Sequence, residues 1–357
     1  MSRLQVQADS ASCLWPSADT LCDLGHISNL RSEHAMLRTI SSMLADDRDL
    51  DGTYPLSTDG GWVYQPSGNG PVLDCTLEIA GDLDAKEQST TPFCLHGRHT
   101  LAPIGMPLRT VTSAPELIRV LYDAMRAHSA ISERCRILHR DISENNILAV
   151  QRDDGSIHGV LIDFDSAVDV SAQRMAARPE RTGTLSFMSI ANLEKLPIER
   201  TVLDDWESLL YLICVISFYG VGNDATASFE LGHPMLMWTE GEPSVIGHAK
   251  RGHLDTENTF MDDVLTHFKH QDGYEHLYDM AIDLYSCLFA NEALKDIPNN
   301  VCHGARIKRI RVGTNKRGRA EYLYVDPFAE RVNFASDIAR DLLDVLARAT
   351  ETANSAD

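Results

Sequence analysis

At residues 137–148 the chain has the sequence ILHRDISENNIL, a polar loop between two short apolar runs. Within this loop, four residues separate Asp141 from Asn146. A carboxylate held in such a loop can accept a proton from a hydroxyl group, and an asparagine oxygen can bind Mg²⁺. The spacing therefore predicts a loop that carries catalytic and metal-binding side chains. A capped loop that contains His-Arg-Asp by coincidence is the alternative.

A second polar group follows at residues 160–165, with the sequence VLIDFD. The pair Asp154-Gly155 predicts a hairpin turn between strands at Ile147–Val150 and Val160–Ile162, so Asp163 stands at the end of a buried strand. A carboxylate in that place can hold a metal ion that bridges phosphate groups, and a simple polar strand end is the alternative. The two polar groups, in this order and joined by one hairpin, favour phosphoryl transfer.

The rest of the chain predicts more helix than strand. Ser113 and Glu116 form a capping box, after which apolar residues keep helical spacing to about Cys135. Further helices are predicted at Leu30–Leu44, Leu209–Val221 and Phe334–Ala349, strands at Val72–Ile79 and Leu95–Pro103, and polar interruptions at 171–182 and 222–258. This order of elements predicts an α+β fold with two unequal lobes.

The charge balance limits the partners of the protein. The chain has 32 lysines and arginines against 52 aspartates and glutamates, and this net charge of −20 argues against nucleic-acid binding because it repels a phosphate backbone. Only seven of the basic residues are lysines, and none precedes Lys86. The basic cluster at residues 306–319 predicts a solvated hairpin, with a nuclear import signal or a docking patch for an acidic partner as the alternatives.

The sequence also limits the compartment. No segment reaches the ~18–20 apolar residues that a membrane span needs, and the N-terminal residues lack the apolar stretch of a signal peptide. The eight cysteines show no C-x-x-C spacing, so we expect free thiols in a reducing compartment and no zinc site. These features predict an intracellular protein, cytoplasmic or nuclear, with no membrane partner.

Two further motifs extend the pattern: RTGTLSFM at residues 181–188, and Asp205-Trp206-Glu207-Ser208 at the start of the most apolar helix. The four motifs together resemble those of eukaryotic protein kinases. Their forms HRDIS, IDFD, RTGT and D-x-E-S are similar to those of the fungal-type protein kinase family. Residues 101–108, LAPIGMPL, resemble the hinge of that family, whose helical lobe usually also has a tryptophan and a lysine where Trp238 and Lys250 stand.

The resemblance implies a two-lobed, protein-kinase-like α+β fold with a reduced N-terminal β lobe and a helical C-terminal lobe. The expected divisions are a poorly patterned segment at residues 1–29, the reduced lobe and hinge at 30–108, the helical lobe with the catalytic loop and activation segment at 109–333, and a C-terminal helix and tail at 334–357.

The resemblance also implies a role for each site residue. Asp141 is expected to be the catalytic aspartate, with Asn146 and Asp163 as Mg²⁺ ligands. Arg140 would meet a phosphate or an acid on the activation segment, and Thr184 would hydrogen-bond Asp141. The other expected site residues are His139 and Asp205 as structural supports, and Ala102, Ile104 and Glu33 at the ATP site.

The chain departs from the family pattern mainly where ATP is gripped. Glu33 resembles the ion-pairing glutamate of the regulatory helix, but the lysine expected on an upstream strand is missing, as is the glycine-rich phosphate loop. A first-turn helix acid is the alternative interpretation of Glu33. Further departures are Asp165 in place of the glycine of Asp-Phe-Gly, Ser189-Ile190-Ala191 in place of Ala-Pro-Glu, and Ser143 in place of a common lysine. Lost phosphate contacts are expected to slow transfer by several orders of magnitude.

We therefore expect a phosphotransferase that transfers the γ-phosphate of ATP, with Mg²⁺, to serine or threonine of a protein substrate. The first alternative is a pseudokinase that binds or scaffolds partners, because the ATP-gripping lysine is missing. The second is a small-molecule kinase of the aminoglycoside phosphotransferase type, against which Arg140 and Gly183-Thr184 argue.

Overall fold

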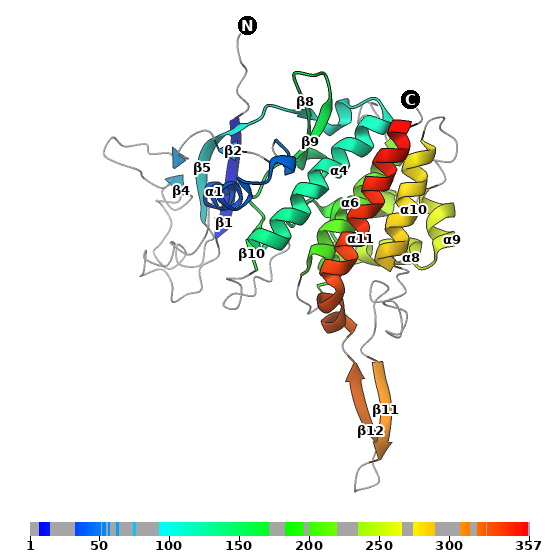
Figure 1. Ribbon diagram of the computed structural model, residues 1–357. Coiled ribbons are helices and arrows are strands. Elements are labelled where there is room, and N and C mark those ends of the chain that lie inside the picture. Colours follow the sequence, from blue (N-terminus) through cyan, green and yellow to red (C-terminus); the bar gives the residue numbers. More distant parts are fainter. Residues whose placement is uncertain are drawn as a thin grey trace, which may run out of the picture.

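In the computed structural model, strands β1 to β10 all lie before residue 170, and the bundle of long helices begins after residue 110 (Figure 1). The two regions therefore overlap along the sequence between residues 110 and 170. It describes residues 7–14, 33–50, 52–54, 56–57, 62–63, 74–75, 93–170, 183–195, 200–219, 235–265, 274–289, 308–314, 320–325 and 327–355. Mixed helices and small sheets confirm the predicted α+β class.

Strand β5 (Phe93–Ala102) organises the N-terminal sheet and confirms the strand predicted at Leu95–Pro103. Along it, β1 (Gln7–Leu14) pairs antiparallel, with Gln7 opposite Thr100 and Leu14 opposite Phe93. Three short strands also pair with β5: β2 (Leu56–Ser57), β3 (Trp62–Val63) and β4 (Asp74–Cys75). Of the strand predicted at Val72–Ile79, the described part is β4.

Strand β1 lies within residues 1–29, a poorly patterned segment in which the sequence predicted no helix or strand. Its sequence, QADSASCL, has no sustained alternation of apolar and polar residues from which a strand could be predicted. The extended conformation depends instead on antiparallel pairing with β5, which is distant in sequence. Helix α1 (Glu33–Leu44) follows, buries Leu37, Ile40 and Leu44, and confirms the helix predicted there.

Two small ladders hold the polar loops that the sequence singles out. Strands β8 (Ile147–Gln151) and β9 (Ile157–Leu161) form the predicted hairpin, with Gly155 at φ 87° in its turn. β6 (Met106–Pro107) pairs with the other edge of β8. β7 (Ile137–Leu138) pairs with β10 (Val168–Asp169), and this pairing draws the loop after β7 toward the segment before β10.

The helical part is built on α4 (Ala114–Ala130). Its N-cap is Ser113, whose hydroxyl oxygen accepts from the amide of Glu116 over 3.5 Å, and it continues as a π-helical turn over Ile131–Cys135. The predicted start and end of this helix are therefore confirmed. Helix α6 (Val202–Tyr219) contains most of the apolar stretch predicted to be helical at Leu209–Val221, and Asp205, expected at its start, lies in its first turn with Asp204.

Helices α4, α6, α10 (Glu275–Phe289) and α11 (Pro327–Ser355) pack against one another (Figure 1). Trp206 and Tyr211 of α6 and Leu342 of α11 are completely buried. Helix α11 extends beyond the predicted Phe334–Ala349 at both ends. In the part of the chain that the structure describes, no helix is both long and apolar enough to cross a membrane.

The polar interruption predicted at residues 222–258 is wrong where the structure describes it. Helices α7 (Leu236–Thr239), α8 (Pro243–His253) and α9 (Glu257–Thr259) occupy this stretch. In α8 the buried residues are Ile246, Gly247 and Lys250, so a charged residue and a glycine take core positions and hide the helical pattern.

The remaining described helices are short: α5 (Ile190–Leu193), a π-helical turn at Phe260–Val264, and 3₁₀ turns at Arg48–Leu50, Leu108–Thr110, Glu144–Asn146 and Leu185–Phe187. The predicted basic hairpin is present as β11 (Lys308–Thr314) and β12 (Ala320–Val325), which extend away from the helices (Figure 1). The loop predicted at 171–182 lies outside the described residues.

Candidate functional site

The backbone of the loop after β7 is fixed by Asp205, which lies in the first turn of α6. One carboxylate oxygen accepts the amide of His139 over 3.1 Å, and the other accepts the amide of Arg140 over 2.9 Å. His128 Nε2 lies 2.8 Å from the same carboxylate. Burial alone raises the pKa of Asp205, but the hydrogen bonds and charge of His128 bring it below its ordinary value. The carboxylate therefore stays ionised and fixes the loop backbone, in which Arg140 has φ 71°.

The carboxylate of Asp141 faces Thr184. Its Oδ1 accepts the amide of Thr184 over 2.7 Å and the hydroxyl of Thr184 over 2.9 Å. Gly183 makes this approach possible, because it has φ 112° and a Cβ there would lie 2.7 Å from the carbonyl oxygen of Arg140. Among the described residues, none donates a hydrogen bond to Oδ2 of Asp141, so this oxygen is left for another group.

Asn146 joins this loop to the end of β9. Its side-chain nitrogen donates to the carbonyl of Asp141 over 2.8 Å, and its own carbonyl accepts the amide of Ile162 over 2.9 Å. Because the nitrogen is used in this way, the amide oxygen of the buried side chain remains the end that can bind a cation. The next residue along from Ile162 is Asp163, which has φ 63°.

His139 ties the same two segments together with a neutral ring. Its Nδ1 accepts the amide of Asp141 over 3.3 Å, and its Nε2 donates to the carbonyl of Ile162 over 2.9 Å. Burial lowers the pKa of His139, which agrees with a ring that uses one nitrogen as acceptor and the other as donor. The ring also packs edge-on against buried Phe164, with centroids 4.7 Å apart.

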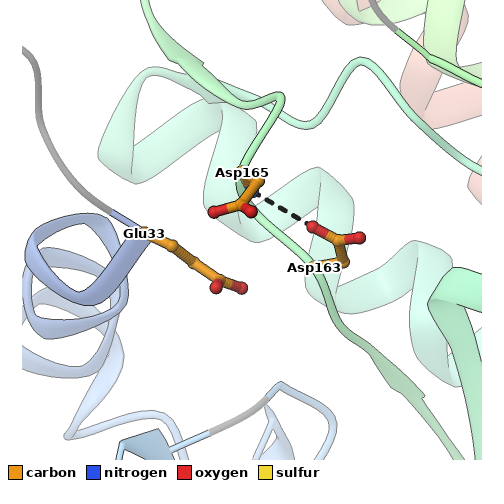
Figure 2. Close-up of side chains that lie close together, drawn as sticks. All are labelled: Glu33, Asp163 and Asp165. Carbon is orange, nitrogen blue, oxygen red and sulfur yellow. Dashed lines mark hydrogen bonds between the residues drawn. The ribbon is translucent and has the colours of Figure 1, made fainter. Parts of the chain in front are cut away.

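Three carboxylates lie close together, those of Glu33, Asp163 and Asp165 (Figure 2). Oxygen atoms of all three lie within 4.8 Å of one another. Glu33 reaches across from α1, and its Oε1 accepts the amide of Phe164 over 2.9 Å. Loss of water around the carboxyl group and then the negative charge of Glu33 raise the pKa of Asp163. A bound cation would therefore reduce the repulsion among these three carboxylates.

The structure thus connects Glu33 to the candidate site, but through the backbone of residue 164. The expected lysine partner has no counterpart in β1, whose residues include none. The first-turn position of Glu33 in α1 also fits the alternative interpretation of a helix acid. Glu33 is therefore both a first-turn helix acid and a side chain that contacts the candidate site.

Ala102 and Ile104 lie outside this hydrogen-bonded group of residues. Ala102 ends β5, opposite Leu56, and Ile104 lies in the connection to β6 with half of its surface exposed. Since β6 pairs with β8, this connection links the N-terminal sheet to the hairpin that precedes Asp163. Arg140 lines a small cavity together with Arg200 and Asp204.

Sequence reasoning missed the residues that hold the chain after Thr184. Asp204 accepts the hydroxyl of Ser189 over 2.7 Å, and Glu207 accepts the amide of Ile190 over 2.7 Å. Both acids are buried in α6. Acidic residues on an otherwise apolar helix indicate buried groups that need hydrogen-bond partners. The spacing of residues along the sequence could not predict that these partners are Ser189 and Ile190.

A family model described as fungal protein kinase matches residues 31–217, which is more than half of the chain. The matched stretch runs from the residues just before α1 to the last turns of α6, so it includes the loop of Asp141 and the segment of Thr184. No curated protein matches the chain.

Proposed function

Because the chain belongs to the fungal protein kinase family, we propose that it transfers the γ-phosphate of ATP, with Mg²⁺, to serine or threonine hydroxyls of a protein. The observation that carries this proposal is the carboxylate of Asp141, whose Oδ1 is fixed by Thr184 while Oδ2 is left for an acceptor. In the proposed arrangement residues 30–108 and 109–333 form the two lobes, and ATP binds between them near Ala102 and Ile104.

The residues of the chain supply the proton chemistry. Asp141 orients the acceptor hydroxyl and takes its proton on Oδ2 as the hydroxyl oxygen bonds to the γ-phosphorus. The bond from that phosphorus to the β–γ bridging oxygen breaks, and ADP leaves with this oxygen. The contacts of Asp205 with two loop amides support the positioning that this step requires.

The donor set suits Mg²⁺, a hard cation that prefers oxygen ligands. Asn146 would supply its amide oxygen, because its nitrogen is bonded to the carbonyl of Asp141. Asp163 would supply a carboxylate, next to a second acid that raises its pKa. When bound, the metal would neutralise charge on the phosphate groups. In this arrangement Glu33 adds negative charge beside the metal.

A pseudokinase is the second candidate, and a specific observation favours it. Strand β1 is the described strand before α1, and it contains no lysine that could hold ATP phosphates. Asp165 also takes the place where the family pattern has a glycine. A pseudokinase could bind a partner without transferring phosphate. It would still have the hydrogen bonds that join His139, Asp141 and Thr184.

Transfer of labelled phosphate distinguishes the two candidates. The full chain is incubated with γ-labelled ATP, Mg²⁺ and a mixture of acceptor proteins, and label on serine or threonine is measured. Asp141→Asn should abolish transfer, whereas Asp153→Asn, at the exposed tip of the β8–β9 hairpin, should leave it unchanged. Transfer that survives Asp141→Asn, or no transfer by the wild-type protein with ATP bound, contradicts the proposal. Label on a metabolite alone would support the small-molecule kinase.

A further inference from the structure

Lys250 is a lysine with no exposed surface, in the middle of α8. Lysine side chains are almost never fully buried unless partners replace the lost water. The neighbouring Arg251 shows the ordinary behaviour of a helix cation, since it remains partly exposed and pairs with Glu194 of the helix-end region after α5. The burial of Lys250 therefore calls for a specific set of partners.

The ammonium group of Lys250 has two carbonyl acceptors and two aromatic rings near it, of which Trp238 is the more distant, with its centroid 5.7 Å away. It donates to the carbonyl of Ser186 over 2.7 Å and to the carbonyl of Met188 over 2.9 Å. It also lies 3.8 Å from the centroid of the Tyr211 ring, a distance typical of a strong cation–π contact. Two carbonyls and one aromatic face account for the three N–H directions of the ammonium group.

The two carbonyls belong to the turn that directly follows Thr184. Within this turn, the amides of Phe187 and Met188 donate hydrogen bonds to the carbonyl of Thr184 over 2.9 and 3.2 Å. Thr184 in turn contacts Asp141 through both its amide and its hydroxyl. The carbonyls that Lys250 holds are thus only two and four residues along the chain from Thr184, which hydrogen-bonds the oxygen of the proposed catalytic aspartate.

Helix α6 is the common support of both sides of the site. Its Asp205 holds the loop of Asp141, and its Glu207 accepts the amide of Ile190 and the hydroxyl of Tyr211. The ring of Tyr211 lies against Lys250. The turn after Thr184 is therefore fixed to α6 through Lys250, while the loop of Asp141 is fixed to it through Asp205.

We propose that Lys250 is a positioning residue that fixes residues 184–188 against α6 and so determines how a protein acceptor is presented to Asp141. Residues Gly183 to Ser186 are partly exposed, and Gly183 and Thr184 adjoin Asp141, so this segment lies beside the carboxylate that a protein hydroxyl would approach. The catalytic part of this inference rests on the proposed function. The structural part, that Lys250 orders this segment, does not.

A purely apolar role would make a different prediction. Methionine at position 250 would still pack against Tyr211 and Trp238, but it would leave the carbonyls of Ser186 and Met188 without their donor. Lys250→Met therefore tests the hydrogen bonds while keeping an unbranched side chain. Arg251→Met is the matched control, since it removes a cation from the same helix and leaves the carbonyls of Ser186 and Met188 bonded.

Hydrogen exchange of backbone amides tests the structural part without any need for catalysis. In Lys250→Met the amides of Thr184, Phe187 and Met188 should exchange at least tenfold faster, while amides of α4 keep their protection. Arg251→Met should leave the same amides unchanged. Equal exchange in wild type and Lys250→Met would overturn the inference, and so would a uniform loss of protection that includes α4.

Wild-type protein provides a test that does not depend on a folded variant. With ¹⁵N in the lysine side chains and at about pH 6, where Lys250 is protonated, one of the seven lysines should show an ammonium group whose protons exchange slowly with water. Absence of any slowly exchanging ammonium group would contradict the bonds to Ser186 and Met188.

Kinetics then tests the catalytic part. If the wild-type protein transfers phosphate, Lys250→Met should raise the KM for the protein acceptor at least tenfold and leave the KM for ATP unchanged. Equal changes in both constants would overturn the positioning role. If the wild-type protein transfers no phosphate, the proposed function fails, whereas the exchange measurement still decides whether Lys250 orders the segment.

Discussion

The two ends of the candidate site differ in how completely they are built. On the helical side, Asp141, Asn146 and His139 are each held by hydrogen bonds that trace back to α6 or to the end of β9. On the strand side, the described contact of Glu33 is with a backbone amide, and β1 has no lysine. The comparison indicates that the residues proposed for proton transfer are held by several hydrogen bonds, whereas the side proposed to hold ATP phosphates lacks a lysine in β1.

After Asp141→Asn, the largest effect is expected from Asp163→Ala. Removing this carboxylate leaves Asn146 as the remaining proposed Mg²⁺ ligand, so phosphate transfer should fall by about 10³-fold or more. The measurement is the initial rate across a series of Mg²⁺ concentrations, with Asp153→Asn as the control. A rate that keeps its wild-type Mg²⁺ dependence in Asp163→Ala would show that the metal is held elsewhere.

Asp205→Ala should have the next largest effect, and it acts on stability. The substitution leaves the amides of His139 and Arg140 without their acceptor inside the protein and removes the partner of His128. Loss of a buried, hydrogen-bonded carboxylate should lower the free energy of unfolding by about 3 kcal/mol. Denaturant unfolding of the two proteins gives the difference, and a loss below about 1 kcal/mol would contradict the role of Asp205 as the support of the loop.

Much of the helical side could be predicted from the sequence because its signals are local. The hairpin follows from Asp154-Gly155, the start of α4 from Ser113 and Glu116, and the polar loop from the spacing of Asp141 and Asn146. The proximity of Thr184 to Asp141 followed from family resemblance, and the structure shows it as two hydrogen bonds. The roles assigned to these residues stay predictions.

The parts that could not be predicted depend on contacts between distant residues. The bond from Phe164 to Glu33 spans 131 positions, and those from Lys250 to the carbonyls of Ser186 and Met188 span more than 60. Periodicity identifies apolar faces, and for this reason a buried lysine in α8 hid the helix instead of indicating it. Strand β1 was missed because its pairing with β5 outweighs its weak local pattern.

The pH dependence of stability should show the cost of burying Lys250. Burial lowers the pKa of Lys250 from 10.5 to about 7, and the negative charge of Glu207 on α6 offsets part of that change. Between about pH 7 and 10.5 the unfolded chain therefore binds one more proton at this residue than the folded protein. The contribution of Lys250 to the free energy of unfolding must rise with pH across this window.

Lys250→Met removes this contribution, so the comparison isolates it from other titrating groups. The difference in unfolding free energy, wild type minus variant, should increase from pH 7 to pH 10 and be constant below about pH 6. A difference that is constant over the whole range would mean that Lys250 keeps its ordinary pKa in the folded protein.

The smallest effect is expected on the strand side, from Glu33→Gln. The amide oxygen of glutamine can still accept the amide of Phe164, and loss of the charge should lower the pKa of Asp163 toward its ordinary value. We expect a change of less than about tenfold in the rate of phosphate transfer and less than about 1 kcal/mol in stability. A loss as large as that of Asp163→Ala would show that Glu33 has the full role of an ion-pairing glutamate, which would remove the contrast between the two sides.

The dependence of the initial transfer rate on Mg-ATP concentration tests the central claim most directly. A complete proton-transfer side and a reduced phosphate-holding side together predict transfer that requires Asp141 and saturates only at high Mg-ATP, with a KM at or above the millimolar end of the usual range for enzymes. Wild-type protein that is saturated with Mg-ATP and transfers no phosphate, or transfer that is unchanged in Asp141→Asn, would contradict it.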